Sequence, residues 1–207
     1  MSPQEWISII KDCLIGLAAI AGIFVGLQGL KTWKRTLTGT SRYTRAKELL
    51  KAVYSVRNGF LHVRNPGIFN YEYPEELLNT YGILDDTKRK EGALHVYTTR
   101  MKVLYEAFSK LEDQSLEAEV EWDSENMLEL IKNLRRCKAE VEQAIRCHVE
   151  LLDRRYDLQE NMEYHREQSE KIYHKGEKYE DDTLTREICS CIREYESKLK
   201  PIIKRGG

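Results

Sequence analysis

A run of eighteen uncharged residues dominates the N-terminal part of the chain. It extends from Cys13 to Leu30 (CLIGLAAIAGIFVGLQGL) and contains one strongly polar side chain, that of Gln28. As an α-helix the run would be about 27 Å long, close to the thickness of a bilayer's hydrocarbon core. Charged residues make up 32% of the 207-residue chain, and all of them lie outside the run. The sequence therefore predicts a segment 1–35 with a transmembrane helix (about 13–30), followed by a polar domain, 36–207.

Basic residues gather directly after the apolar run. Residues 31–51 hold seven lysine or arginine residues and one glutamate, a net charge of +6, whereas residues 1–30 sum to −1. Basic residues mark the cytoplasmic side of a span. We therefore expect the N-terminus outside and the C-terminal domain in the cytoplasm, with the span in the inner (cell) membrane of a bacterium.

Residues that typically settle at a membrane surface flank the run. Trp6 and Trp33 bracket it, where interfacial aromatic side chains lie, and Lys31, Lys34 and Arg35 follow its inner end. A cleaved signal peptide is one alternative, but it carries its positive charge before the apolar stretch, whereas here the charge follows. A buried core helix of a soluble protein is another, and the two tryptophans argue against it.

Small residues recur along the run at helical spacing. Ala18, Gly22 and Gly26 stand four residues apart, so they share one face of a helix and leave a groove for a second helix. The spacing predicts homo-oligomerisation through this face, although glycine and alanine are also common in membrane helices without such a role. One span cannot enclose a channel, so a pore requires several copies around an axis.

Apolar residues repeat with helical spacing through most of the polar domain. The pattern predicts helices over 42–63, 87–111, 123–153 and 181–200, with Asp123 or Ser124 capping the third, Pro201 ending the last and a short helix at 75–81. A short polar link is expected at 36–41 (TLTGTS), and a solvated turn at the acidic run 117–125. The sequence therefore predicts an all-α protein, with a cytoplasmic helical bundle after the span.

The sharpest local motif lies in the first of these helices. Arg57 and His62 are separated by four residues (RNGFLH), which resembles the R-x4-6-H signature of the α-helical HEPN ribonucleases. The resemblance implies that His62 acts as general acid/base on a ribose 2′-hydroxyl and that Arg57 stabilises charge on the phosphate. It also implies that two copies of the motif complete the site.

Two features favour a structural role for this motif instead. On a straight helix the two side chains lie about 140° apart, so one faces the core if the other faces solvent. The HEPN family also places its motif late in the domain, whereas here it lies close to the membrane. Arg57, Arg64 and Asn65 are equally suited to bind a buried carboxylate and to position the Asn-Pro turn. We therefore name Arg57 and His62 as HEPN-like candidates and expect no enzymatic activity.

No metal or cofactor site is predicted. The cysteines show no disulfide framework and fit a reducing cytoplasm; they are Cys13, Cys137, Cys147, Cys189 and Cys191. The Cys-Ser-Cys triplet at 189–191 has too few companions to hold zinc. The basic cluster 31–51 is suited to nucleic acid or, at a membrane, to anionic lipid headgroups.

Several features together resemble a known family. They are the single apolar span, the exit Thr32-Trp33-Lys34-Arg35, the segment 57–66 and the acidic helical remainder. This layout resembles the small accessory proteins encoded beside the RNA-guided RNA nuclease of type VI-B CRISPR loci. The resemblance implies a homo-oligomeric membrane pore with a divergent HEPN-like domain, which enhances antiphage defence by permeabilising or depolarising the inner membrane.

The same resemblance implies three partners: other copies of the chain, the lipid bilayer and an RNA-guided nuclease acting upstream. Two alternatives stay open at the level of the sequence. One is a membrane-tethered HEPN-type ribonuclease that uses Arg57 and His62. The other is a non-enzymatic, membrane-anchored helical adaptor whose polar domain docks a partner protein.

Overall fold

The computed structural model describes residues 3–122, 126–152, 162–174 and 182–206. Over these residues the chain forms five α-helices and three short 3₁₀ turns. No strand forms within them, apart from one isolated antiparallel bridge between Leu78 and Leu84. The described part of the chain is therefore all-helical, which confirms the coarse fold class predicted from periodicity.

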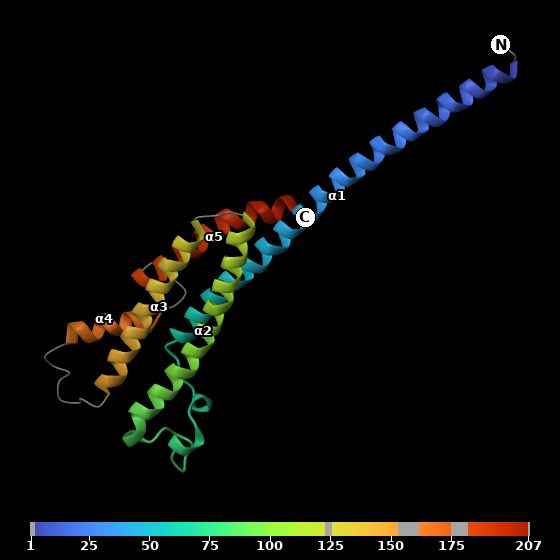
Figure 1. Ribbon diagram of the computed structural model, residues 1–207. Helices are drawn as coiled ribbons and strands as arrows, with labels where there is room; N and C mark the ends of the chain where they lie inside the picture. The colour runs from blue at the N-terminus through green and yellow to red at the C-terminus, as the bar shows by residue number, and fades with distance from the viewer. Residues whose placement is uncertain (1–2, 123–125, 153–161, 175–181, 207) are drawn as a thin grey trace.

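Helix α1 (Pro3–Val63) is the central feature of the fold, with 61 residues and a length of about 90 Å. Its N-terminal part projects away from every other helix, and its C-terminal part lies among them (Figure 1). The link expected at 36–41 is wrong, because these residues are helical. The hydroxyl of Thr38 donates to the carbonyl of Lys34 at 2.9 Å, and a lone glycine between two established helical segments costs only about 1 kcal/mol. Helix α1 thus passes without a break through the expected boundary at residue 35.

Helix α2 (Arg89–Trp122) returns alongside α1 and extends beyond its predicted end at Leu111. Residues 117–122, expected in a solvated turn, are helical. Two of their acidic side chains contact α1: Glu117 and Glu121 both pair with Arg45, and the hydroxyl of Ser41 donates to Glu121 at 2.8 Å. These interhelical pairs extend α2 toward the N-terminal side of the domain.

The remaining helices are α3 (Asn126–Leu151), α4 (Met162–Ile172) and α5 (Thr183–Gly206). Pro201 was expected to end the last helix, but α5 continues through it to Gly206, and Ile202 and Ile203 beyond it pack against the core. The expected helix at 75–81 is reduced to a 3₁₀ turn, Glu75–Leu77. The expected caps Asp123 and Ser124 and the predicted start at Asp181 lie outside the described residues.

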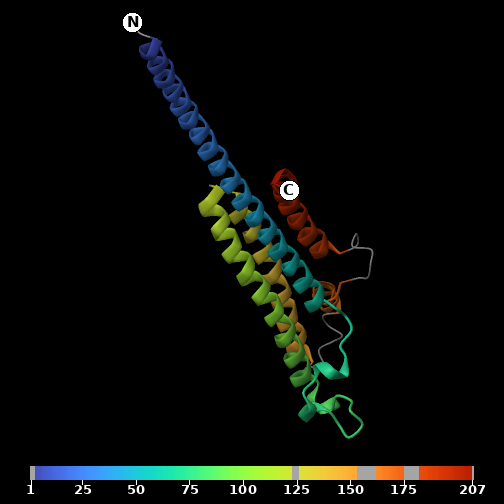
Figure 2. The same ribbon diagram turned by 90° about the vertical axis from the view of Figure 1, so that its right-hand side faces the viewer.

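The core forms where α2 and α5 meet the C-terminal part of α1 and where α3 packs against α2 and α5. Its largest fully buried side chains are Leu49, Val53 and Val56 of α1, Tyr97, Leu104, Phe108 and Leu111 of α2, Leu130 and Leu134 of α3, Ile172 of α4, and Tyr195 and Leu199 of α5. Helices α1 and α2 approach closely at Gly59, where an added Cβ would stand 3.2 Å from the Cα of Leu104. The connection from α1 to α2 lies at the end of the molecule opposite the N-terminus (Figure 2).

Candidate functional site on the first helix

The apolar stretch of α1 is exposed along its whole described length. From Leu14 to Leu37 the large apolar side chains are all more than half exposed. Among the described residues, α1 is the one helix long and apolar enough to cross a membrane, and none of its most apolar window is buried within the chain. The stretch is therefore not a core helix of this fold, which contradicts that alternative.

The small residues of this stretch form an open groove. At about 100° per residue, Ala18, Gly22, Gly26 and Gly29 fall within roughly 80° of one another on the helix. No neighbouring atom lies within 4 Å of a Cβ built at Gly22, Gly26 or Gly29. Nothing in the described chain fills the groove, so the face predicted for self-association is free to accept another helix.

A short helical stalk, residues 31–41, connects the apolar stretch to the domain. Lys31, Trp33 and Lys34 are exposed on it, with 69% of Trp33 accessible. The side chains of Trp6 and Arg35 lie outside the described set, although the backbone of both residues is helical. The stalk is about 16 Å long and ends at Ser41, whose hydroxyl contacts α2.

Arg57 and His62 are not brought together in the described chain. The Arg57 guanidinium lies 4.7 Å from the centre of the Tyr54 ring and donates to the amide oxygen of Asn58 at 3.3 Å. His62 is exposed on another side of α1. The two side chains thus lie about 140° apart around the helix axis, and one copy of the chain forms no paired Arg-His site.

Arg64, rather than Arg57, binds a buried carboxylate. Only 2% of its side chain is exposed, and it pairs with Asp182 at the start of α5. It also donates to the Thr185 hydroxyl at 2.6 Å and to the backbone carbonyls of Lys171 and Glu170 at 2.8 and 3.0 Å. Arg64 therefore fastens the end of α1 to both α4 and α5.

Asp182 caps α5 while it holds Arg64. Its carboxylate accepts the backbone N–H groups of Leu184 and Thr185 at 3.0 and 3.3 Å, which stabilises the first turn of the helix. Burial alone would raise the pKa of Asp182, but hydrogen bonds from Thr185 and Arg64 outweigh burial and hold that pKa below its usual value. The pair is therefore charged at neutral pH.

A second buried arginine was not predicted from the sequence. Arg100 of α2 donates to Glu72 at 2.7 Å and to the backbone carbonyl of Asn65 at 2.7 Å, and the hydrogen bond from Arg100 lowers the pKa of Glu72. Asn65 in turn accepts the backbone N–H of Gly67 at 3.0 Å, which shapes the Asn-Pro turn as proposed. The sequence could have indicated that Arg100 is buried, because this charged residue stands within the apolar stripe of α2, between Tyr97 and Leu104.

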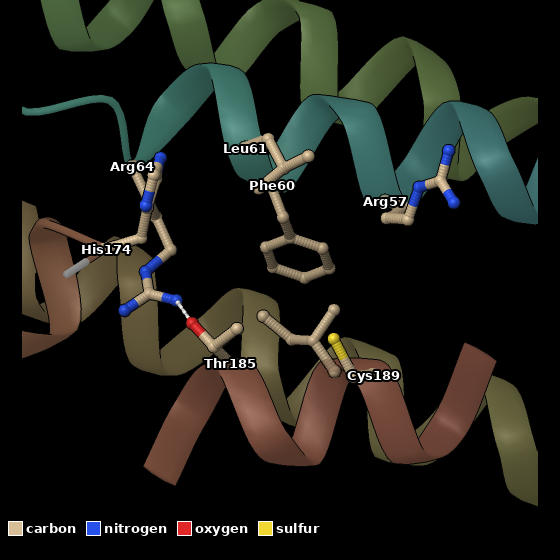
Figure 3. A pocket seen from close by; sticks show the side chains of 8 residues that line it. Arg57, Phe60, Leu61, Arg64, His174, Thr185 and Cys189 are labelled. Carbon is tan, nitrogen blue, oxygen red and sulfur yellow. Dashed lines mark hydrogen bonds between the residues drawn. The ribbon is translucent and has the colours of Figure 1, made fainter. Parts of the chain in front are cut away.

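A cavity of about 350 Å³ lies between α1 and α5. Its lining consists of Arg57, Phe60 and Leu61 from α1, Arg64 directly after α1, His174 after α4, and Thr185, Ile188 and Cys189 from α5. Figure 3 shows Arg57 at one end of this space, His174 at the other, and the Phe60 ring between them. His62 is absent from the lining, so the cavity does not bring the two motif residues together.

Searches with known proteins identify no relative of this chain: no protein-family model, curated protein or solved structure matches it. Among the described residues, no group of three or more His, Cys, Asp or Glu side chains could hold a metal ion.

Proposed function

We propose that this protein is a membrane-anchored homo-oligomer whose first helix spans the bilayer and associates with copies of itself. The observation that carries the proposal is the projecting part of α1, which is apolar, exposed throughout and lined on one face by Ala18, Gly22 and Gly26. Water would strongly disfavour so much exposed apolar surface, whereas a bilayer or neighbouring helices would cover it. The basic stalk favours an N-terminus outside and a cytoplasmic domain.

Several parallel spans around an axis would form a pore that permeabilises or depolarises the inner membrane. The resemblance to the type VI-B accessory proteins suggests antiphage defence as its setting, downstream of an RNA-guided nuclease. Continuity of α1 supports a coupled mechanism, since a rotation of the domain would turn the attached span with it. We propose no catalytic step, because one copy of the chain holds Arg57 and His62 apart.

Paired glycine substitutions test this proposal. Gly22→Leu with Gly26→Leu would fill the groove, while Gly16→Leu adds the same side chain on the far side of the helix, about 120° from the centre of the groove. In the isolated chain none of these positions has a neighbour within 4 Å, so the variants leave the fold unaffected. Each full-length variant is labelled for energy transfer between copies and reconstituted in dye-loaded liposomes.

The double variant is expected to lose both energy transfer and dye release, and Gly16→Leu is expected to keep both. Equal behaviour of the two would show that the small-residue face carries no association. Wild-type protein that stays monomeric in the bilayer and releases no dye would refute the pore and favour a tethered adaptor.

A further inference from the structure

The cavity between α1 and α5 has the dimensions of a small-molecule site. Its volume of about 350 Å³ falls in the range of about 300–1,000 Å³ typical of ligand pockets, which combine apolar walls with a few polar groups. Phe60 and Ile188 supply apolar surface from the two facing helices. The cavity is therefore suited to the body of an organic molecule.

Arg57 supplies a positive charge that no carboxylate of the described residues pairs with directly. The nearby Glu196 accepts a hydrogen bond from the Tyr54 hydroxyl and forms an ion pair with Lys200 at 3.0 Å. Among the described residues, Arg57 directly contacts an amide oxygen and an aromatic ring, and it interacts with Glu196 at longer range without forming an ion pair. By contrast, Asp182 compensates the charge of Arg64. An anion entering at this end of the cavity would therefore meet an available guanidinium.

His174 closes the opposite end of the cavity. Its Nδ1 atom is buried and has no hydrogen-bond partner among the described residues, although a buried polar atom without a partner costs free energy. The backbone N–H of His174 donates to the carbonyl of Arg64 at 3.0 Å, which fixes the residue at the end of α1.

We propose that the cavity binds a small organic anion with an apolar, preferably aromatic, body. The body lies between Phe60 and Ile188, and the anionic group faces Arg57. The site belongs to a single copy of the chain and does not depend on the membrane assembly proposed above.

The test uses the full chain in nanodiscs of zwitterionic lipid, with 4-(trifluoromethyl)benzoate as the probe and ¹⁹F NMR line broadening as the readout. Empty nanodiscs and the neutral 4-(trifluoromethyl)benzamide control for partition into lipid. For a probe of this size we expect saturable binding with a Kd on the order of 1 mM. Arg57→Gln should weaken binding of the benzoate at least about fivefold, the equivalent of one lost charge-assisted contact, whereas Arg193→Gln, on the exposed side of α5, should leave it unchanged.

A second pair of variants tests the location. Cys189→Trp fills the cavity from α5 and should abolish binding, while Ser190→Trp, one residue away and exposed, should not. Circular dichroism shows whether each variant keeps its helical content, and Arg57→Gln alters only a half-exposed side chain. The proposal is overturned if the benzoate shows no saturable binding above empty nanodiscs, or binds Arg57→Gln and the wild type equally.

Discussion

Because α1 is continuous, we expect the assembly to depend on how far the span is rotated about the helix axis relative to the domain. Alanines inserted after Gly39 extend the stalk at a position where no other side chain lies within 4 Å, so the insertions leave the domain's packing intact. Each added residue turns the span by about 100° relative to the domain and moves it by about 1.5 Å. A flexible link would transmit neither the rotation nor the shift.

The expected result follows from this geometry. Two inserted alanines rotate the small-residue face by about 200°, which points it away from the position that the assembled domains require. Seven alanines rotate it by about 700°, only about 20° short of two full turns, while lengthening the stalk by about 10.5 Å. Dye release from liposomes should therefore be lost with two alanines and largely recovered with seven.

A Gly-Pro-Gly-Ser insertion at the same site provides the matched control, because it breaks the helix at similar length. It should abolish dye release as the two-alanine insertion does. If all the insertions release dye as well as the wild type, α1 acts as a simple tether, and the coupled mechanism is wrong.

Three further predictions concern the domain. Because the pKa of Asp182 is lowered in the folded chain, its stabilising effect is present above the ordinary carboxyl pKa of about 4 and is lost as the pH falls through the lower folded-state value. Asp182→Asn should reduce the free energy of unfolding at pH 7 by about 3–5 kcal/mol. In urea titrations at several pH values, the variant should also lose this dependence of stability on acid pH. Unchanged stability would contradict the role of the buried pair. Gly59→Ala places a Cβ 2.9 Å from Leu104 Cδ1 and should cost about 1–3 kcal/mol, whereas Gly39→Ala should cost nothing; equal thermal stability of the two variants would refute this close approach. On labelled RNA, Arg57→Ala and His62→Ala should match the wild type, and RNA cleavage by the wild type alone would restore the nuclease hypothesis.

Much of the helical pattern follows from the sequence because apolar spacing reports burial directly. The stripe predicted over 42–63 is buried at Ala46, Leu49, Val53 and Phe60, and the helix ends before the Asn-Pro-Gly turn as expected. The exposed span could also be predicted, since eighteen residues without a charge are incompatible with an ordinary polar surface.

Other features depend on partners that are distant in sequence. Residues 36–41 have loop-like composition, yet helix propagates through them because both flanks are already helical and extension costs far less than nucleation. The acidic end of α2 becomes helical through pairing with Arg45, 72 residues away from Glu117. Similarly, the Arg64–Asp182 pair joins residues 118 apart. No local pattern specifies such contacts.

The contrast between Arg57 and Arg64 shows the same dependence on partners that are distant in sequence. Both are basic residues near the end of α1, and spacing alone leaves either free to bind a buried carboxylate. The position of α5 decides between them, because Asp182 and Thr185 at its start meet Arg64. Arg57, about two turns earlier in the helix, lies beside the cavity instead.

The mass of the intact particle in lipid nanodiscs tests the central claim most directly. One chain has a mass of 24.3 kDa, so native mass spectrometry distinguishes an assembly from single copies without any assumption about activity. Self-association through α1 predicts a discrete multiple of this mass, which falls toward the single chain when Gly22 and Gly26 are replaced by leucine. A wild-type particle containing one chain over a range of protein-to-lipid ratios would contradict the account.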